Sequence, residues 1–233
     1  MNRFLKRAWA EIDLDALEHN YNEIKKLAKG KDILAVVKAN AYGHDDKAVC
    51  LKLQELGVKY YGVSNLWEGE KLRQHGITGT ILTFGYTDED YFDELLEYGI
   101  TQTAGSVQYA KQLSDYAVSK GVKLPVHIKV NTGMTRVGID SQQEMLDIIA
   151  MPGLDCKAAY THFAAADSLD PSDVEYTDRQ QEKLMKIAKD KGLLIHSQNS
   201  GGIIYHGDFG GDIVRAGVIP VSYTHLRAHE TDQ

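Results

Sequence analysis

The chain has 233 residues, of which 43% are hydrophobic and 25% charged, a composition typical of a soluble globular protein with one sizeable core. Its formal net charge of −7 and its mixed charge pattern argue against a nucleic-acid partner, because such a partner requires a clustered basic face. No apolar run approaches the roughly 20 residues of a membrane span, and residues 1–10 lack the apolar core of a signal peptide. Cys50 and Cys156 lack metal-pair spacing, so we expect reduced thiols, no metal and a cytoplasmic location.

Taken in order, the chain alternates predicted strands and helices. Residues 9–12 are a strand candidate, and residues 14–28 a helix whose apolar positions recur at helical spacing after the capping residue Asp13. Eight further strands are predicted at residues 33–38, 61–64, 80–84, 101–104, 126–131, 158–163, 194–198 and 213–218. The helices between them are predicted at residues 46–56, 66–75, 88–98, 106–120, 142–149 and 176–191.

Eight strands joined by helical connections predict an α/β fold, a (β/α)8 TIM-type parallel barrel, for which about 250 residues are typical. A doubly wound open sheet is the alternative, but no G-x-G-x-x-G motif follows the first strand. No convincing helix follows the eighth strand. We therefore expect helix 14–28 to take that outer position.

The C-terminal stretch breaks this pattern. Residues 221–231 resemble a translated sequencing adapter of the transposase type, so we interpret residues 220–233 as a non-native tail and residues 1–219 as one barrel domain. A native polar C-terminus is the alternative. The two histidines of this tail carry no weight in the functional interpretation.

Lys38 stands at the predicted carboxyl end of a buried strand, where an amine is either a Schiff-base nucleophile or a stray charge. On position alone, a lysine that snorkels to water is the commoner case. The residues that follow shift this balance, because Ala39, Ala41 and Gly43 let the backbone approach a ligand closely and Tyr42 offers a hydroxyl.

Other polar residues also stand at strand ends, where a parallel barrel builds its active site. Arg136 follows the fifth strand in a glycine-rich loop, and its planar guanidinium suits a carboxylate, although it can equally be a surface charge. His162 ends the sixth strand and can be a satisfied core histidine. Arg215 lies within the apolar eighth strand and needs a buried acceptor or a ligand.

Asn199 and Ser200 follow the seventh strand and precede two glycines. Backbone amides there and near Gly217 and Val218 would form a phosphate cradle of the kind found after strands seven and eight of such barrels. A lone Ser-Gly-Gly is more often a simple turn. Its position, with Arg215 following, favours the cradle.

Residues 35–44, Ala-Val-Val-Lys-Ala-Asn-Ala-Tyr-Gly-His, strongly resemble the pyridoxal-phosphate lysine motif of alanine racemases. Residues 132–138, Thr-Gly-Met-Thr-Arg-Val-Gly, resemble the T-G-M-x-R-x-G segment of the same family. The resemblance implies that Lys38 is the Schiff-base lysine and one catalytic base, that Arg136 binds the substrate carboxylate, and that Lys129 is a possible carbamylated lysine holding Arg136. The cofactor-binding residues that it implies for pyridoxal 5'-phosphate are Lys38, Tyr42, His162, Asn199, Ser200, Arg215, Gly217 and Val218.

The chain departs from the family pattern at Asp45, Asn131 and Ala216, where glycine, aspartate and proline are usual. The resemblance leads us to expect that the family's C-terminal β domain, whose tyrosine acts in the partner subunit as the second base, is missing from this chain. The resemblance implies an isomerase that interconverts L- and D-alanine for cell-wall precursors, a homodimer at full length, with little activity in this fragment. The alternatives are a racemase of serine or another small amino acid and a non-catalytic single-domain pyridoxal-phosphate carrier.

Overall fold

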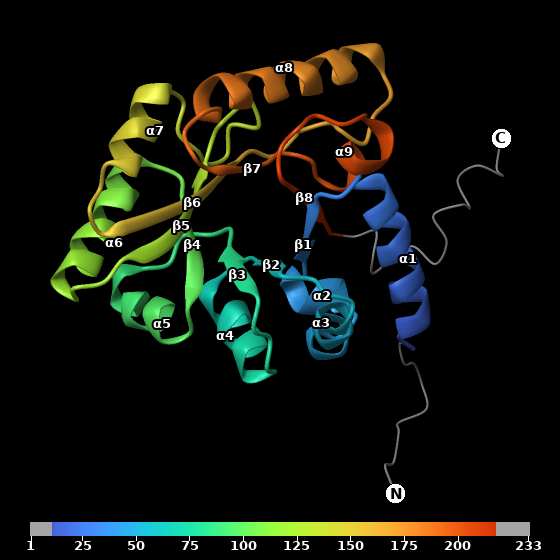
Figure 1. Ribbon diagram of the computed structural model, residues 1–233, viewed down its shortest axis with the longest axis horizontal. Coiled ribbons are helices and arrows are strands. Elements are labelled where there is room, and N and C mark those ends of the chain that lie inside the picture. The colour runs from blue at the N-terminus through green and yellow to red at the C-terminus, as the bar shows by residue number, and fades with distance from the viewer. Residues whose placement is uncertain (1–10, 218–233) are drawn as a thin grey trace, which may run out of the picture.

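The computed structural model describes residues 11–217 and contains one sheet of eight parallel strands in the order β7-β6-β5-β4-β3-β2-β1-β8 (Figure 1). Two backbone hydrogen bonds join the ends of this order. Asp212 N donates to Ile195 O at 2.8 Å, and Arg215 N donates to Gln198 O at 2.9 Å. The sheet is therefore a nearly closed barrel, and the predicted (β/α)8 fold is confirmed.

The strands are short, and each of β1 to β7 is followed by helical structure. They are β1 (Asp32–Val36), β2 (Tyr60–Val63), β3 (Thr80–Thr83), β4 (Ile100–Ala104), β5 (Leu124–Lys129), β6 (Leu154–Tyr160), β7 (Leu194–His196) and β8 (Ile213–Ala216). The helices are α1 (Leu14–Leu27), α2 (Lys38–Gly43), α3 (Asp46–Glu55), α4 (Leu66–Gln74), η1 (Glu89–Tyr91), α5 (Phe92–Glu97), α6 (Val107–Ser119), α7 (Gln142–Ile149), α8 (Pro171–Ala188) and α9 (Ser200–Tyr205).

Helix α1 takes the outer position expected for the helix after the eighth strand. It begins at Asp13, whose Oδ1 accepts the N–H groups of Asp15 and Ala16, and it packs against α3 and α9 (Figure 1). The strand predicted at residues 9–12 is wrong where it can be compared with the structure. Glu11 and Ile12 belong to no strand, and residues 9 and 10 lie outside the described residues.

Several predicted bounds are also wrong. Strand β1 ends at Val36, so Lys38 lies two residues beyond it, and β6 ends at Tyr160, so Thr161 and His162 follow it. The predicted helix 88–98 is divided into η1 and α5. Helix α8 begins five residues earlier than predicted because Asp170 caps its N-terminus. The predicted tail at residues 220–233 lies outside the described residues.

The barrel interior is apolar in its middle and polar near the carboxyl ends of the strands. Leu34, Leu82 and Ile213 form a small core of their own inside the barrel. Gly62 leaves room there for a ring, because a Cβ atom at this position would lie 2.7 Å from Cζ of Phe84. Toward the carboxyl ends of the strands the buried side chains include Lys129, His196 and Arg215.

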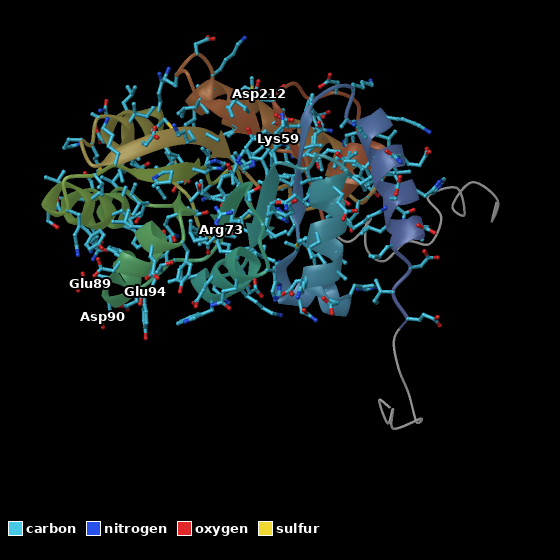
Figure 2. The ribbon with its side chains drawn as sticks, turned by 60° about the horizontal axis from the view of Figure 1, so that its bottom comes forward. Lys59, Arg73, Glu89, Asp90, Glu94 and Asp212 are labelled. Carbon is cyan, nitrogen blue, oxygen red and sulfur yellow. The ribbon has the colours of Figure 1, made fainter. Side chains whose placement is uncertain are left out.

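Arg73 of α4 ties down the segments that enter β3 and β4 (Figure 2). Its guanidinium donates hydrogen bonds to four backbone carbonyl oxygens, those of Ile77 (2.7 Å), Gly79 (2.7 Å), Tyr98 (2.8 Å) and Gly99 (3.0 Å). These contacts lie at the edge of the barrel opposite the carboxyl ends of the strands.

Within residues 11–217, no helix is long and apolar enough to cross a membrane. The same part of the chain holds no group of three or more histidine, cysteine or acidic residues arranged for a metal ion.

Candidate active site

The residues that follow Lys38 form one turn of left-handed helix, which the sequence analysis did not predict. All four carry positive φ angles of 51–56°: Ala39, Asn40, Ala41 and Tyr42. A non-glycine residue costs roughly 1–2 kcal/mol in this conformation, so contacts from outside the turn must hold it. A hydrogen bond from Ala41 N to Val37 O at 2.9 Å joins the turn to the residue before Lys38.

This turn carries the Tyr42 hydroxyl to the end of β8. A Cβ atom placed on Gly217 would lie 2.8 Å from Tyr42 Oη, so only a glycine allows this approach. The Gly217 N–H donates to Ser200 Oγ at 3.1 Å. Burial raises the pKa of Tyr42, which keeps its hydroxyl protonated as a donor. Tyr42, Ser200 and Gly217, three of the predicted cofactor-binding residues, therefore lie together, while Val218 lies outside the described residues.

Asn199 shapes the neighbouring loop. It caps α9 by accepting the Gly202 N–H on Oδ1 at 3.0 Å, and its Nδ2 donates to Phe163 O at 3.4 Å. The side chain thus holds the end of β7 and the segment after β6 in one position.

Arg215 is 3% exposed and reaches across the barrel near the carboxyl ends of the strands. Its Nη1 donates to His196 O at 2.7 Å and lies 3.2 Å from His196 Nδ1, and its Nη2 donates to Thr161 O at 2.6 Å and Ser197 O at 3.0 Å. These are the buried acceptors that an arginine in an apolar strand requires. Within the described chain the Nε–H has no acceptor. Burial lowers the pKa of Arg215 to about 10, so the guanidinium keeps its proton at neutral pH.

The histidine bonded to Arg215 is His196, whereas the resemblance placed His162 beside this arginine. Because His196 Nδ1 faces an arginine N–H, it is the acceptor nitrogen, and Nε2 carries the proton that it donates to His127 Nδ1 at 3.1 Å. The ring also stacks on Tyr160 at 4.7 Å between centroids. Burial, the largest cause, lowers the pKa of His127 to about 4 and that of His196 well below its ordinary value. Both histidines are therefore neutral.

His162 and Lys129 are neutral for the same physical reason. Burial, followed by the charges of Arg215 and others, lowers the pKa of His162 to about 3. Burial, followed by Arg215 and Arg136, lowers the pKa of Lys129 to about 6. Lys129 Nζ lies 5.1 Å from the centroid of the Tyr160 ring. No carboxylate pairs with Lys129 in the described part of the chain.

Arg136 lies in the loop after β5. Asn131 folds this loop by accepting the N–H groups of Gly133 (3.2 Å) and Thr135 (3.0 Å) on its Oδ1, a role in which it replaces the usual aspartate. The Arg136 side chain is exposed. Because the loop follows β5, Arg136 lies at the carboxyl ends of the strands, and its charge contributes to lowering the pKa values of Lys129 and His162.

Three further side chains hold the site and were missed in the sequence analysis: His127, His196 and Gln180. Gln180 of α8 donates to Thr132 Oγ1 at 3.1 Å and to His162 O at 3.3 Å, and so joins the loops after β5 and β6. A usable signal existed for His127, which stands two residues before Lys129 in an apolar strand and therefore faces the same side. No pattern marks Gln180 within its amphipathic helix.

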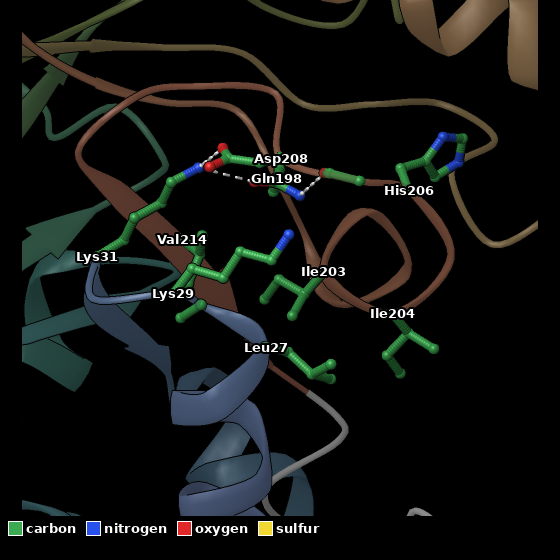
Figure 3. Close-up of a pocket in the computed structure, with 11 residues that line it drawn as sticks. Leu27, Lys29, Lys31, Gln198, Ile203, Ile204, His206, Asp208 and Val214 are labelled. Atoms are coloured by element: carbon green, nitrogen blue, oxygen red, sulfur yellow. Dashed lines mark hydrogen bonds and ion pairs between the residues drawn. The ribbon is translucent and has the colours of Figure 1, made fainter.

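A cavity of about 140 Å³ lies elsewhere, between the end of α1 and α9 (Figure 3). One wall is closed by Lys31, which pairs with Asp208 and contacts Gln198 Oε1 at 3.4 Å. It is therefore distinct from the strand-end site. Lys38, Arg136 and Arg215 make that site cationic in a chain of net charge −7, which suits a ligand bearing phosphate and carboxylate groups.

Comparisons with known proteins agree with this arrangement. The family model for "Alanine racemase, N-terminal domain" matches residues 12–224. An alanine racemase of Clostridium perfringens is 38% identical over 233 residues, which cover 96% of this chain and 60% of that protein. A solved alanine racemase of Clostridium difficile 630 matches with a TM-score of 0.87 and 37% identity over 94% of this chain and 59% of its own.

A solved histidine racemase from Leuconostoc mesenteroides matches with a TM-score of 0.82 and 27% identity over 90% of this chain and 57% of its own. The chain thus spans about 60% of the length of the curated relatives that it matches first. With a family model that matches most of its residues and a barrel superimposable on solved members, the chain belongs to the alanine racemase N-terminal domain family.

Proposed function

We propose that this chain is the cofactor-binding barrel of an alanine racemase, an isomerase that at full length interconverts L- and D-alanine in the cytoplasm and supplies D-alanine for peptidoglycan. The observation that carries the proposal is the convergence of Lys38, Tyr42, Ser200, Gly217 and Arg215 at one end of a family barrel. The positive charge of Lys38, Arg136 and Arg215 suits the carboxylate of an amino acid such as alanine, and we propose neither a nucleic acid nor a membrane as a partner.

The residues present fit pyridoxal 5'-phosphate. The Tyr42 hydroxyl, Ser200 and the Gly217 backbone lie together where a phosphate would bind, and Asn199 holds their loop. The Arg215 Nε–H is a donor available for a ring nitrogen, with His162 close enough to feel its charge. Bound there, the cofactor supplies an aldehyde that condenses with an amine and a conjugated ring that accepts electrons from Cα. By family resemblance Val218 would add a backbone amide.

Arg215 controls how this site handles protons. Its pKa of about 10 keeps it charged, so it donates a hydrogen bond without giving up the proton. His196, itself neutral, fixes the guanidinium through Nδ1 at 3.2 Å. Arg215 would therefore hydrogen-bond a ring nitrogen without protonating it, and would in this way favour racemisation over transamination. Arg215→Glu in the full-length enzyme should raise the transamination product, and an unchanged product ratio would contradict this role.

Lys129 and Arg136 would bind the substrate carboxylate as a unit. A lysine with a pKa of about 6 is largely a free amine at neutral pH, and a free amine adds to CO2 to give a carbamate with loss of one proton. The resulting negative charge would lie among Arg136, Arg215 and Lys38 and would hold the Arg136 fork toward a carboxylate.

Lys38 would move the proton on one face of Cα. Racemisation requires a second base on the opposite face. We propose that the second base comes from a longer chain in a homodimer, so that the 233-residue chain racemises little or not at all.

The test titrates the chain with pyridoxal 5'-phosphate and follows the absorbance of the bound cofactor. The wild-type chain should develop a band that Lys38→Ala abolishes, and an identical band in both would refute the assignment. Substrate choice is tested on the full-length enzyme with alanine, serine and histidine, because a histidine racemase shares this barrel. Alanine turnover fastest supports the proposal, a serine preference supports the alternative racemase, and cofactor binding without any turnover supports a carrier.

A further inference from the structure

The Glu68 carboxylate joins the ends of two strands. Its Oε1 accepts the N–H of Ala39 at 2.8 Å, and its Oε2 accepts the N–H of Ser64 at 2.7 Å and the Ser64 hydroxyl at 2.6 Å. Ala39 is the residue after Lys38, and Ser64 directly follows β2. Hydrogen bonds to a carboxylate are shorter and stronger than those between neutral groups. One side chain of α4 therefore fastens the start of the left-handed turn to the neighbouring strand.

The next turn of α4 holds the next residue of the turn. Lys71 Nζ lies 2.9 Å from Asp46 Oδ2 and 3.4 Å from Asn40 Oδ1, and the Asp46 N–H donates to Asn40 Oδ1 at 3.1 Å. Residues three apart face the same side of a helix, so Glu68 and Lys71 contact consecutive residues of the turn, Ala39 and Asn40.

Helix α7 offers a comparison that separates this contact from ordinary capping. Glu144 stands at the third position of α7, as Glu68 does in α4, and accepts the Asp140 and Ser141 N–H groups and the Ser141 hydroxyl, each at 2.9 Å. All of these donors are local. Glu68 makes the same type of local contact to Ser64 but uses its other oxygen for a residue 29 positions away in sequence. The contact to Ala39 is therefore additional to the capping role.

From this difference we infer that Glu68 is a positioning residue: its hydrogen bond to Ala39 keeps the left-handed turn closed, and so sets where the Lys38 amine and the Tyr42 hydroxyl lie relative to one another. Four non-glycine residues at positive φ relax toward other conformations when they are not held. Such relaxation would move the amine away from the Tyr42, Ser200 and Gly217 cluster without unfolding the barrel. Of the two measurements that test this inference, only the affinity for pyridoxal 5'-phosphate rests on the proposed function.

The test compares Glu68→Gln with the matched control Glu144→Gln in the 233-residue chain. Gln keeps the size of the side chain, but its amide has a single acceptor oxygen. Its N–H2 group must therefore face one of the two backbone N–H donors, Ala39 or Ser64, with which it cannot form a hydrogen bond. Ala39 is exposed, so Glu68 is the acceptor that protects its N–H. Amide hydrogen exchange at Ala39 should accelerate about tenfold or more in Glu68→Gln and stay unchanged in Glu144→Gln, as expected for loss of one charge-assisted hydrogen bond. Equal exchange in the two variants overturns the inference.

The second readout is the apparent dissociation constant for pyridoxal 5'-phosphate from its absorbance band. We expect a rise of about tenfold or more in Glu68→Gln and none in Glu144→Gln, even where both lower the melting temperature equally. A loss of affinity that only follows the melting temperature overturns the positioning role. If Glu68→Gln fails to fold, Glu68→Asp replaces it, since this shorter carboxylate does not span both partners, and wild-type behaviour of Glu68→Asp overturns the inference.

The two readouts separate this inference from the proposed function. If the wild-type chain shows no absorbance band that depends on Lys38, the cofactor role of Lys38 is refuted. The exchange rate of the Ala39 amide then still tests whether Glu68 holds the left-handed turn closed.

Discussion

The left-handed turn after Lys38 makes a prediction of unusual sign: replacing an alanine by glycine should stabilise the protein. Ala39 has a φ of 53° and is exposed, so Ala39→Gly removes a backbone penalty of about 1–2 kcal/mol and no buried contact. Glycine also gives the unfolded chain more freedom, which costs about 0.4–1 kcal/mol. The net gain is about 0.5–1 kcal/mol, or roughly 1–4 °C in melting temperature for a chain of this size.

Two matched variants test the origin of this gain. Ala41→Gly relieves the same strain but removes a fully buried methyl group worth about 0.8 kcal/mol, so its net effect should be near zero. Ala48→Gly lies in the right-handed helix α3 and should cost about 0.5–1 kcal/mol. Urea unfolding followed by circular dichroism measures all three. Destabilisation of Ala39→Gly to the same extent as Ala48→Gly would refute the left-handed geometry.

Three further predictions concern the barrel itself. Gly62→Val places a side chain against Phe84 inside the barrel and should cost about 1–3 kcal/mol in urea unfolding; wild-type stability would show that the interior has spare room. Arg73→Ala should lower the free energy of unfolding by about 3 kcal/mol, because four carbonyl oxygens lose their hydrogen-bond donor. Arg179→Ala, which removes an exposed ion pair, should lower it by less than about 1 kcal/mol, and equal losses in the two variants would contradict the stabilising role of Arg73. The pKa of His127 is about 4 in the folded chain and about 6.5 unfolded, so the unfolded state binds the extra proton between these values. The free energy of unfolding should fall as pH decreases from 6.5 to 4, with on the order of 3 kcal/mol from His127 and a further loss from His162 and His196, whose pKa values burial also lowers; a flat profile would contradict the burial of these rings.

The barrel was predictable because its signals are local. Most of the strands are short, largely apolar runs, although the buried strand β4 reads Ile-Thr-Gln-Thr-Ala. Glycines at positive φ follow the helices, among them Gly57, Gly76 and Gly121. The outer position of α1 followed from the missing eighth helix. Bounds failed where local pattern and tertiary pairing differ: β6 begins at Leu154 because it pairs with β5 from Leu124 onward, although residues 155–157 are partly or fully exposed.

The site was predictable only in part. Positions in or just after predicted strands, together with family motifs, pointed to Lys38, Arg136 and Arg215. The contacts of these side chains depend on strand register, which the sequence does not specify. Hence the histidine that bonds Arg215 is His196 and not His162. The left-handed turn has no glycine to announce it, and it depends on Glu68 far along the chain. Long-range acceptors of this kind leave no periodic pattern.

The most direct test of the central claim is reduction of the cofactor-loaded chain with borohydride, followed by mass mapping of its peptides. The account predicts a single reduced adduct on Lys38, lost in Lys38→Ala and weakened in Glu68→Gln. An adduct on another lysine, or none, would contradict the assignment of Lys38 as the residue that binds the cofactor.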